Sequence, residues 1–330
     1  MLSNRWDEHM RAIVFDGQLK FDADRPDPKP QPGECLLRVH MAGICATDHH
    51  ITHGYMDFCG ILGHEMVGTV VKASSRRLGK RVACEINCVC GKCDMCHAGL
   101  ANHCRRRTVM GISGRDGCFA DLVAVPERNL HELPDAVSDE EAVFVEPLAA
   151  AYQVIKQVPI ERRMRVAVVG SGRLGLLVAQ VLARTGCKLE VFGRNPHTLL
   201  FCEKKGIQAT ALAEAAARND FDVVVECSGS PEGMGIALTL VRPRGTIVLK
   251  STCAHGGGAP VDLSPQVVNE VSVIGSRCGP FPDAIQALAR RDIDVSSMVT
   301  RVYKIDRGLE AFEESARPDA IKVLLRIDPN

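Results

Sequence analysis

Four cysteines crowd one short segment of the sequence. Cys90, Cys93, Cys96 and Cys104 follow the spacing C-x2-C-x2-C-x7-C. Four thiolates on one loop can close a tetrahedron around zinc and leave no coordination position for a substrate. The spacing therefore predicts a structural zinc site. Cys88 is a fifth thiol that could replace Cys90, and buried or disulfide-paired cysteines are the alternative interpretation.

A second set of metal-type residues is scattered along the first half of the chain: Cys45, His64, Glu65 and Glu146. Singly, a residue such as His64 is more often a core or surface histidine than a ligand. A thiolate, an imidazole and a carboxylate together can hold zinc and leave the fourth position for water or substrate. The set therefore predicts an open catalytic zinc site, where the metal can act as a Lewis acid.

A glycine-rich turn follows in the second half of the chain. Gly170, Gly172 and Gly175, with Arg173 and Leu174 between the last two, form G-x-G-x-x-G between an apolar strand and a helical run. The first glycine permits a tight turn, the second lets a pyrophosphate approach the backbone, and the third lets helix and strand pack closely. The context predicts a dinucleotide site at a helix N-terminus, against the alternative of a turn without nucleotide.

The end of the next strand bears on which dinucleotide binds. An NAD site usually has an acidic residue there to accept hydrogen bonds from the ribose 2′-hydroxyl. Here residues 188–192 are followed by Gly193, Arg194 and Asn195, and Glu190 comes too early in the strand. Glycine and arginine leave room and charge for a 2′-phosphate, which favours NADP over NAD. The alternative is that Arg194 is a solvated loop residue.

Irregular β-structure is expected to position the metal-type residues. Short β-type runs occur at residues 12–15, 35–40, 67–71 and 122–125. Residues 24–32 hold four prolines and are expected to form a connector, neither strand nor helix. The pattern predicts a mostly antiparallel β domain.

From about residue 150 the pattern changes to alternating helices and strands. A helix is expected over 142–157 and a continuous apolar strand over 165–169. Further strands are expected at 188–192, 222–226, 246–250 and 271–274, with helices between them. This alternation is typical of an α/β domain with a doubly wound parallel sheet. A helix at 282–290 and a strand at 322–327 are expected to complete the chain.

Composition excludes several classes of partner. Lysine plus arginine equals aspartate plus glutamate, 40 against 40, and only 4% of residues are aromatic. Neither nucleic acid nor a membrane surface is indicated. The longest apolar stretch, around 174–183, is about half of the ~20 residues needed to span a bilayer. The charged N-terminus does not resemble a secretory signal, and an odd count of 15 cysteines suits a reducing cytoplasm.

The motifs G-I-C-A-T-D, G-H-E, the four-cysteine lobe, E-P and G-x-G-x-x-G occur in that order along the chain. In this respect the sequence resembles the zinc-containing medium-chain dehydrogenase/reductase family over essentially its whole length. The resemblance implies a GroES-like β-rich catalytic domain at 1–150 and 286–330, around a Rossmann NAD(P)-binding domain at 151–285. It implies hydride transfer between a nicotinamide cofactor and an alcohol or its carbonyl.

The resemblance also implies roles for individual residues. Cys45 and His64 match the constant zinc ligands, and Glu146 matches the third-ligand position, which is acidic in polyol and sugar dehydrogenases. Glu65 matches a glutamate that either binds the metal or stands beside it. Thr47 matches the hydroxyl that receives the substrate proton. His50 matches the histidine that ends the relay, which carries the proton from this hydroxyl through the cofactor ribose to the histidine and then to water.

Three further cofactor contacts are expected from their places in the chain. Ser228 follows the strand at 222–226 and lies along the cofactor crevice. Arg277 follows the strand that reaches the nicotinamide, and Lys322 matches a basic residue that faces the pyrophosphate. For Arg277 and Lys322 the alternative is pairing with a surface carboxylate.

Two departures from the family affect the pocket and the cofactor. Residues 71–81 are shorter than the usual loop, and the acidic residue after the second cofactor strand is missing. The acidic third-ligand position favours a polar secondary alcohol as the small-molecule substrate, and the family commonly forms homodimers or homotetramers. A non-enzymatic or metal-sensing member with structural zinc only is the alternative function.

Overall fold

The computed structural model describes residues 9–73, 76–215, 217–252 and 261–328 of the protein. The chain divides into two compact units. Unit 1 comprises Met1–Glu146, Leu288–Arg290 and Val299–Asn330, and unit 2 comprises Pro147–Ala287 and Arg291–Met298.

Unit 1 is built mainly from antiparallel strands. Its largest sheet has the order β10-β6-β5-β3-β18-β17, with β9 also paired to β3; β17 and β18 run parallel. A second sheet has the order β2-β1-β4, and β7 pairs with β8. The strands are β1 (His9–Phe15), β2 (Leu19–Pro26), β3 (Glu34–Gly43), β4 (Gly60–Ile61), β5 (Glu65–Lys72), β6 (Arg81–Cys84), β7 (Asn87–Cys88), β8 (Thr108–Val109), β9 (Leu122–Pro126), β10 (Leu130–Glu132), β17 (Val299–Lys304) and β18 (Lys322–Arg326).

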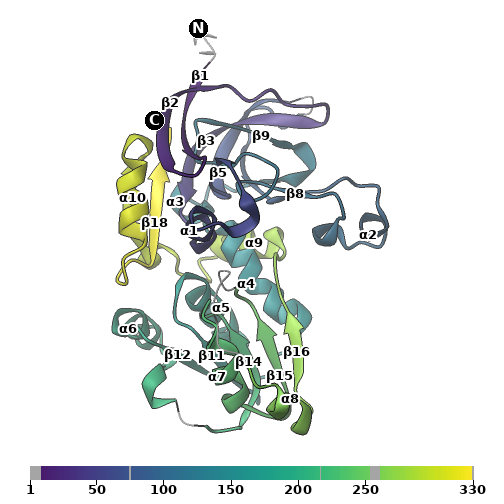
Figure 1. Ribbon diagram of the computed structural model, residues 1–330, viewed down its shortest axis with the longest axis vertical. Helices are drawn as coiled ribbons and strands as arrows, with labels where there is room; N and C mark the ends of the chain where they lie inside the picture. Colours follow the sequence, from purple (N-terminus) through teal and green to yellow (C-terminus); the bar gives the residue numbers. More distant parts are fainter. Residues whose placement is uncertain (1–8, 74–75, 216, 253–260, 329–330) are drawn as a thin grey trace. The chain divides into compact units, whose positions relative to one another are not determined.

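Short helices connect these strands. They are α1 (Ala46–Thr52), α2 (Asp94–His97), α3 (Asp139–Ala142) and α10 (Gly308–Ser315), with the 3-10 turns η1 (Tyr55–Asp57), η2 (Ala101–His103), η3 (Glu127–Asn129) and η6 (Ile305–Arg307). Figure 1 shows α2 at the far end of a lobe that extends beyond β8. This lobe carries the four-cysteine motif.

Unit 2 contains a six-stranded parallel sheet of order β13-β12-β11-β14-β15-β16. Chain order reverses direction between β11 and β14, as in a doubly wound fold. The strands are β11 (Arg165–Val169), β12 (Lys188–Gly193), β13 (Gln208–Ala211), β14 (Phe221–Glu226), β15 (Val241–Leu249) and β16 (Ser272–Gly275). The helices are α4 (Val145–Gln157), which starts in unit 1, α5 (Arg173–Ala183), α6 (Pro196–Lys204), α7 (Gly233–Leu240), α8 (Ser264–Val268) and α9 (Phe281–Ala289), with η4 (Leu212–Glu214) and η5 (Ser296–Met298).

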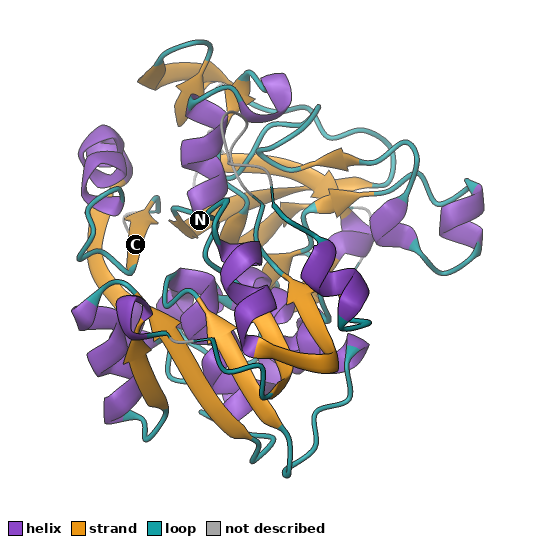
Figure 2. Ribbon diagram, turned by 60° about the horizontal axis from the view of Figure 1, so that its bottom comes forward, coloured by secondary structure: helices purple, strands orange, loops and turns teal. Residues whose placement is uncertain are grey.

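The central strands of unit 2 are continuous apolar runs because helices cover the sheet (Figure 2). Parallel sheets packed on both faces have such strands, without the alternation of half-exposed sheets. The core includes Val169 on β11, Val224 on β14 and Ile247 on β15. The predicted α/β class with a doubly wound sheet is confirmed.

One expectation was wrong in part. Residues 24–32 were expected to avoid regular structure, yet β2 continues to Pro26, which pairs with His9. Because β2 lies at the edge of its sheet, a proline there breaks no ladder on its outer side. The segment becomes irregular after Pro26.

Candidate active site

The first candidate metal site lies in unit 1, where β3 pairs with β5. Cys45 stands at the N-terminus of α1, two residues after the end of β3, and Glu65 opens β5. The antiparallel register places Gly43 opposite Glu65, which brings the two segments together. One ligand-type atom from each of Cys45, His64 and Glu65 lies within 4.8 Å of the others. The structure therefore gathers three of the predicted metal residues.

Asp48 supports this group, although the sequence motifs did not identify it. Its side chain is fully buried. Its carboxylate accepts hydrogen bonds from the backbone N–H groups of Cys45 (2.8 Å) and Gly63 (3.2 Å). Its Oδ1 also lies 3.4 Å from Nδ1 of His64. The available signal was an acidic residue three positions after Cys45, which is the pattern of a capping box.

Asp48 also sets the charge of His64. Burial lowers the pKa of an imidazole, but Asp48 and Cys45 act more strongly together and hold the pKa of His64 well above its ordinary value. Nδ1 of His64 is buried and makes no hydrogen bond among the described residues. A carboxylate beside a metal-binding histidine commonly orients the ring and fixes its tautomer. The arrangement of Asp48 and His64 suits that role.

The donor set fits zinc. A thiol, an imidazole and a carboxylate each offer one ligand atom, and these three atoms lie within 4.8 Å of one another. These donor types are those of open zinc sites. Cys45, His64 and an acidic residue would hold the metal, and the remaining position is open to substrate.

Glu65 is paired with Lys322 inside unit 1. The two side chains are almost completely buried, and Nζ of Lys322 donates to Oε2 of Glu65 and to the carbonyl of Ile44, the latter at 3.2 Å. Gly43 leaves them room, because a Cβ there would lie 2.7 Å from both Glu65 Oε2 and Lys322 Cε. Lys322 was expected to face a pyrophosphate. Its burial and its contacts with Glu65 and Ile44 place it instead beside the metal-type group.

Glu146 stays a prediction as a metal ligand. It is half-buried in the first turn of α4, in unit 1. The group that gathers Cys45, His64 and Glu65 does not include it.

Thr47 and His50 both lie on α1. Oγ1 of Thr47 is 3.8 Å from Sγ of Cys45, so the hydroxyl stands next to a predicted ligand. The ring of His50 packs edge-on against Tyr55, with centroids 6.3 Å apart. Burial and the nearby His53 lower the pKa of His50 from its ordinary value of 6.5. The imidazole is therefore neutral at pH 7 and able to accept a proton.

The second candidate metal site is the four-cysteine lobe. Its ligand sulfurs lie within 4.8 Å of one another, with Sγ of Cys93 3.5 Å from that of Cys96 and 3.8 Å from that of Cys104. Backbone N–H groups of Cys90 and Arg106 point at Sγ of Cys104, at 3.3 and 3.4 Å. Backbone hydrogen bonds also lower the pKa of Cys93 to about 6. Burial acts in the opposite direction on Cys96 and raises its pKa to about 11, so the hydrogen bonds favour the thiolate form at Cys93 and not at every member of the cluster.

Cys88 does not belong to this second group. Asn129 Nδ2 donates to its sulfur at 3.7 Å, and the sulfur is directed to the carbonyl of Ile86 at 3.9 Å. Burial raises the pKa of Cys88, in contrast to that of Cys90, which is lowered. Cys90, the residue expected first, is therefore the fourth member of the cluster.

The glycine turn connects β11 to α5 in unit 2. Gly170 has a φ of +103°, and a Cβ there would lie 2.7 Å from the backbone of Ser228. A Cβ on Gly175 would lie 1.9 Å from the carbonyl oxygen of Gly170. A Cβ on Gly172 would meet no heavy atom of the described chain within 4 Å, its two chain neighbours apart. Two glycines are thus required for packing, and the second leaves open space, as a pyrophosphate site needs. Arg173 and Leu174 begin the helix.

At the end of β12, the space beside Gly193 is taken by a protein side chain, where room for a 2′-phosphate was expected. A Cβ on Gly193 would lie 2.0 Å from Oγ of Ser171, so the glycine makes room for a protein side chain. Arg194 is 68% exposed and lies 3.8 Å from the carboxylate of Glu232. Asn195 caps α6 by accepting from the N–H of His197 at 2.9 Å.

Two other expected cofactor residues lie at the carboxyl ends of the sheet. Ser228 lies two residues after the end of β14. Arg277 follows β16, its side chain is exposed, and its carbonyl accepts a hydrogen bond from Nζ of Lys250. Glu190, which was judged too early in β12 to bind a ribose, is buried and paired with Arg218 at 2.7 Å. Its engagement there agrees with that judgement.

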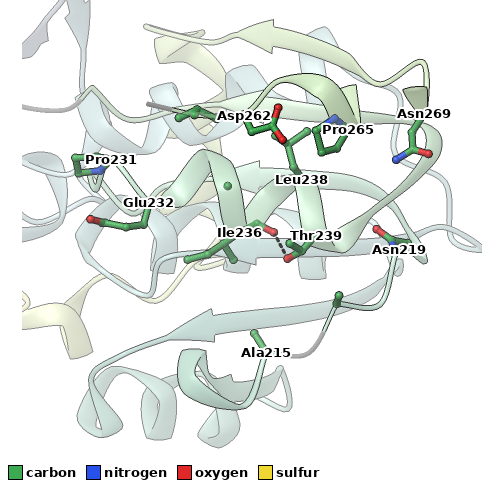
Figure 3. A pocket seen from close by; sticks show the side chains of 13 residues that line it. Ala215, Asn219, Pro231, Glu232, Ile236, Leu238, Thr239, Asp262, Pro265 and Asn269 are labelled. Carbon is green, nitrogen blue, oxygen red and sulfur yellow. Dashed lines mark hydrogen bonds between the residues drawn. The ribbon is translucent and has the colours of Figure 1, made fainter. Parts of the chain in front are cut away.

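A hollow of about 750 Å³ lies elsewhere in unit 2 (Figure 3). Its walls come from α7, from the start of α8 and from neighbouring loops, and they include Ile236, Leu238 and Pro265. None of the predicted site residues lines it. Glu232 lines the hollow and also approaches Arg194, which links this space to the end of β12.

In the part of the chain that the structure describes, no helix is long and apolar enough to cross a membrane.

Comparisons with known proteins identify the family. Residues 31–135 match the alcohol dehydrogenase GroES-like domain, and residues 174–291 match the zinc-binding dehydrogenase domain. A sorbitol dehydrogenase of Halalkalibacterium halodurans is 29% identical, covering 92% of this chain and 94% of the relative.

Solved structures agree with these matches. A zinc-binding dehydrogenase of Sinorhizobium meliloti bound to NADP has a TM-score of 0.86 at 29% identity, covering 96% of this chain and 99% of its own. An alcohol dehydrogenase of Escherichia coli complexed with NADH has a TM-score of 0.87 at 28% identity, covering 97% and 100%. The chain therefore belongs to the zinc-dependent medium-chain dehydrogenases, which are NAD(P)-dependent oxidoreductases of alcohols.

Proposed function

We propose that the protein is a polyol dehydrogenase that oxidises a secondary alcohol of a polar, sugar-like molecule, or reduces the matching carbonyl. The convergence of Cys45, His64 and Glu65 beside the helix that bears Thr47 and His50 carries this proposal. The similarity to a sorbitol dehydrogenase favours a polyol substrate, as does the acidic residue at the third-ligand position.

The two metal sites have different roles in this proposal. Cys45, His64 and Glu146 would hold the catalytic zinc, while Cys90, Cys93, Cys96 and Cys104 would hold a structural one. When bound at the first site, zinc supplies Lewis acidity that makes an alcohol easier to deprotonate. The four-cysteine site is closed by its own ligands and stabilises the lobe.

The residues of α1 handle the proton. Thr47 presents its hydroxyl next to Cys45, where it accepts the proton of the substrate alcohol and passes its own onward. His50 lies one helical turn away on the same helix and is neutral at pH 7 because its pKa is lowered. It can therefore take up the proton and release it to water.

For the cofactor we propose NADP in preference to NAD. Arg194 supports this choice, because its exposed guanidinium follows β12 where an NAD site has an acidic residue. Gly172 supplies the open space for the pyrophosphate. We expect Arg194→Asp to lower the ratio of kcat/KM with NADP to that with NAD; an unchanged ratio would contradict the argument.

The assembly and domain limits are also proposals. We propose domains at 1–150 with 286–330 and at 151–285, supported by the different sheet types of the two units. A homodimer or homotetramer is supported by exposed apolar side chains on α8, where Val267 and Val268 are 76% and 79% exposed. The thiols on the described chain support a reducing compartment, the cytoplasm.

A panel of polyols, sugars and simple alcohols, each assayed with NAD and NADP, tests the function. We expect turnover of polyols, two zinc ions per chain by metal analysis, and loss of turnover in Cys45→Ser. The control Cys59→Ser changes an exposed thiol outside both metal groups and should keep activity. Full turnover together with full zinc content in Cys45→Ser would refute the assignment.

A further inference from the structure

Glu226 is a buried carboxylate with three hydrogen bonds. It ends β14, and only 4% of it is exposed. Oε1 accepts from the backbone N–H of Ser228 at 2.6 Å and from the hydroxyl of the same residue. Oε2 accepts from the hydroxyl of Ser251 at 2.6 Å. Both carboxylate oxygens are therefore committed to neighbouring loops.

These contacts join two loops into one network. The hydroxyl of Ser251 accepts from the N–H of Gly229 at 2.9 Å, and that of Ser228 accepts from the N–H of Ser230 at 3.1 Å. One loop follows β14 and the other follows β15, and these strands are neighbours in the sheet (Figure 1). Glu226 thus fixes the positions of both strand ends.

The network contacts the glycine turn directly. The backbone of Ser228 lies against Gly170, where a Cβ would be only 2.7 Å away. Chain order reverses between β11 and β14, and ligands of doubly wound sheets bind at the carboxyl ends of the strands at such a reversal. Gly233 at the start of α7 packs so closely that its Cβ would lie 2.4 Å from Oε1 of Glu226.

We propose that Glu226 is a positioning residue for the nicotinamide cofactor. It holds the Ser228 loop against the glycine turn, and it holds Ser251 at the end of the adjacent strand. Through these two serines it shapes the cofactor-facing edge of the sheet without needing to touch the cofactor. The proposal rests on the proposed function, because it presumes that a nicotinamide dinucleotide binds at this edge.

Replacing Glu226 with glutamine changes the direction of one hydrogen bond. The N–H of Ser228 requires an oxygen, so the amide nitrogen must face Ser251. The hydroxyl of Ser251 would then accept from both that nitrogen and Gly229, and its own proton would lose its acceptor. The volume of the side chain hardly changes, so the substitution tests the hydrogen-bond pattern and not the packing.

The experiment measures the dissociation constants of NADPH and NADH by fluorescence titration of the full-length, zinc-loaded protein. We expect Glu226→Gln to weaken binding about tenfold, the scale of one lost hydrogen bond to a charged group. Glu226→Asp keeps the charge and should fall between this variant and the wild type. Ser251→Ala removes a different member of the network and should also weaken binding, which keeps the test valid if Glu226→Gln folds poorly.

Glu190→Gln is the matched control. Glu190 is equally buried at 4% exposure, but it lies within β12 and bonds to Arg218 and Thr210, not to the loops at the sheet edge. We expect cofactor affinity within about twofold of wild type in this variant. Wild-type affinity in both Glu226→Gln and Ser251→Ala, or equal weakening in the Glu190 control, would overturn the proposal. If the wild-type protein bound neither cofactor, the proposed function itself would fail instead.

Discussion

Substituting Lys322 by methionine tests how the buried ion pair with Glu65 contributes to unit 1. Methionine keeps most of the length of the lysine stem but removes the ammonium group. Glu65 is 1% exposed and Lys322 is 2% exposed, so water does not replace the lost partner. The carboxylate of Glu65 would remain buried without the ammonium group that donates to it, and the carbonyl of Ile44 would lose a donor as well.

The expected cost is large because both charges are buried. Breaking a buried pair by removing one partner typically costs about 3–5 kcal/mol. In the zinc-free protein we therefore expect Lys322→Met to lower the free energy of unfolding by about 3 kcal/mol or more. With zinc present the loss should be smaller, because Glu65 lies within 4.8 Å of the ligand atoms of Cys45 and His64. The metal would supply a positive charge near the carboxylate of Glu65, which has lost its lysine partner.

Urea unfolding followed by circular dichroism measures these differences, with and without a chelator. Arg307→Met is the control, because the Arg307–Glu310 pair is 60% and 55% exposed and solvent screening leaves such a pair little effect on stability. Combining Lys322→Met with Glu65→Gln removes both charges and should recover part of the loss. A loss below about 1 kcal/mol in zinc-free Lys322→Met would refute the reasoning, since that is the scale of an exposed pair.

Three other predictions address the remaining sites. Cys90→Ser should lose one zinc per chain in metal analysis while Cys88→Ser keeps both, and loss from Cys88→Ser alone would contradict the assignment of the cluster. Gly172→Ala should weaken the binding of NADPH in a titration and leave the unfolding midpoint unchanged. Gly175→Ala should lower the unfolding midpoint, because the Cβ of the new alanine would lie 1.9 Å from the carbonyl oxygen of Gly170. The pKa of His50 in the folded protein is lowered below its ordinary value of 6.5. As the pH falls through 6.5, the unfolded chain therefore binds a proton at His50 more readily than the folded protein does, and the free energy of unfolding decreases. His50→Gln should therefore reduce the loss of stability between pH 7 and 5, as read from unfolding midpoints, and an unchanged pH profile would contradict this.

The parallel sheet of unit 2 was predictable because its strands are short, continuous apolar runs. The expected strand at 165–169 coincides with β11, and that at 222–226 differs from β14 by one residue. β17 was not predicted, since its residues Val299–Lys304 are mostly exposed or half-buried and lack a strong pattern. It forms because β18, distant from β3 in the sequence, pairs with both. Pairing between strands that are distant in the sequence depends on the whole fold and cannot be predicted from the local pattern of residues.

The same distinction applies to the candidate site. Cys45, His64 and the four cysteines could be found from residue type and order, because metal ligands are few in kind. The roles of Asp48 and Lys322 depend on contacts with Gly63, His64 and Glu65. Lys322 was expected to face the pyrophosphate because it matches the place of a basic residue with that role in the family. Its burial against a carboxylate could be known only once β18 was placed beside β3.

The Lys322 contact also bears on which glutamate serves as the third zinc ligand. Glu65 already has a buried ammonium partner, so zinc would have to compete with an existing ion pair for its oxygens. Glu146 begins a helix and is only half-buried, so reorienting its side chain carries a smaller cost. We therefore expect Glu146→Gln to lose the catalytic zinc more readily than Glu65→Gln in metal titrations with a competing chelator. The reverse order would show that Glu65 leaves Lys322 to bind the metal, and the buried ion pair would then be a feature of the zinc-free protein alone.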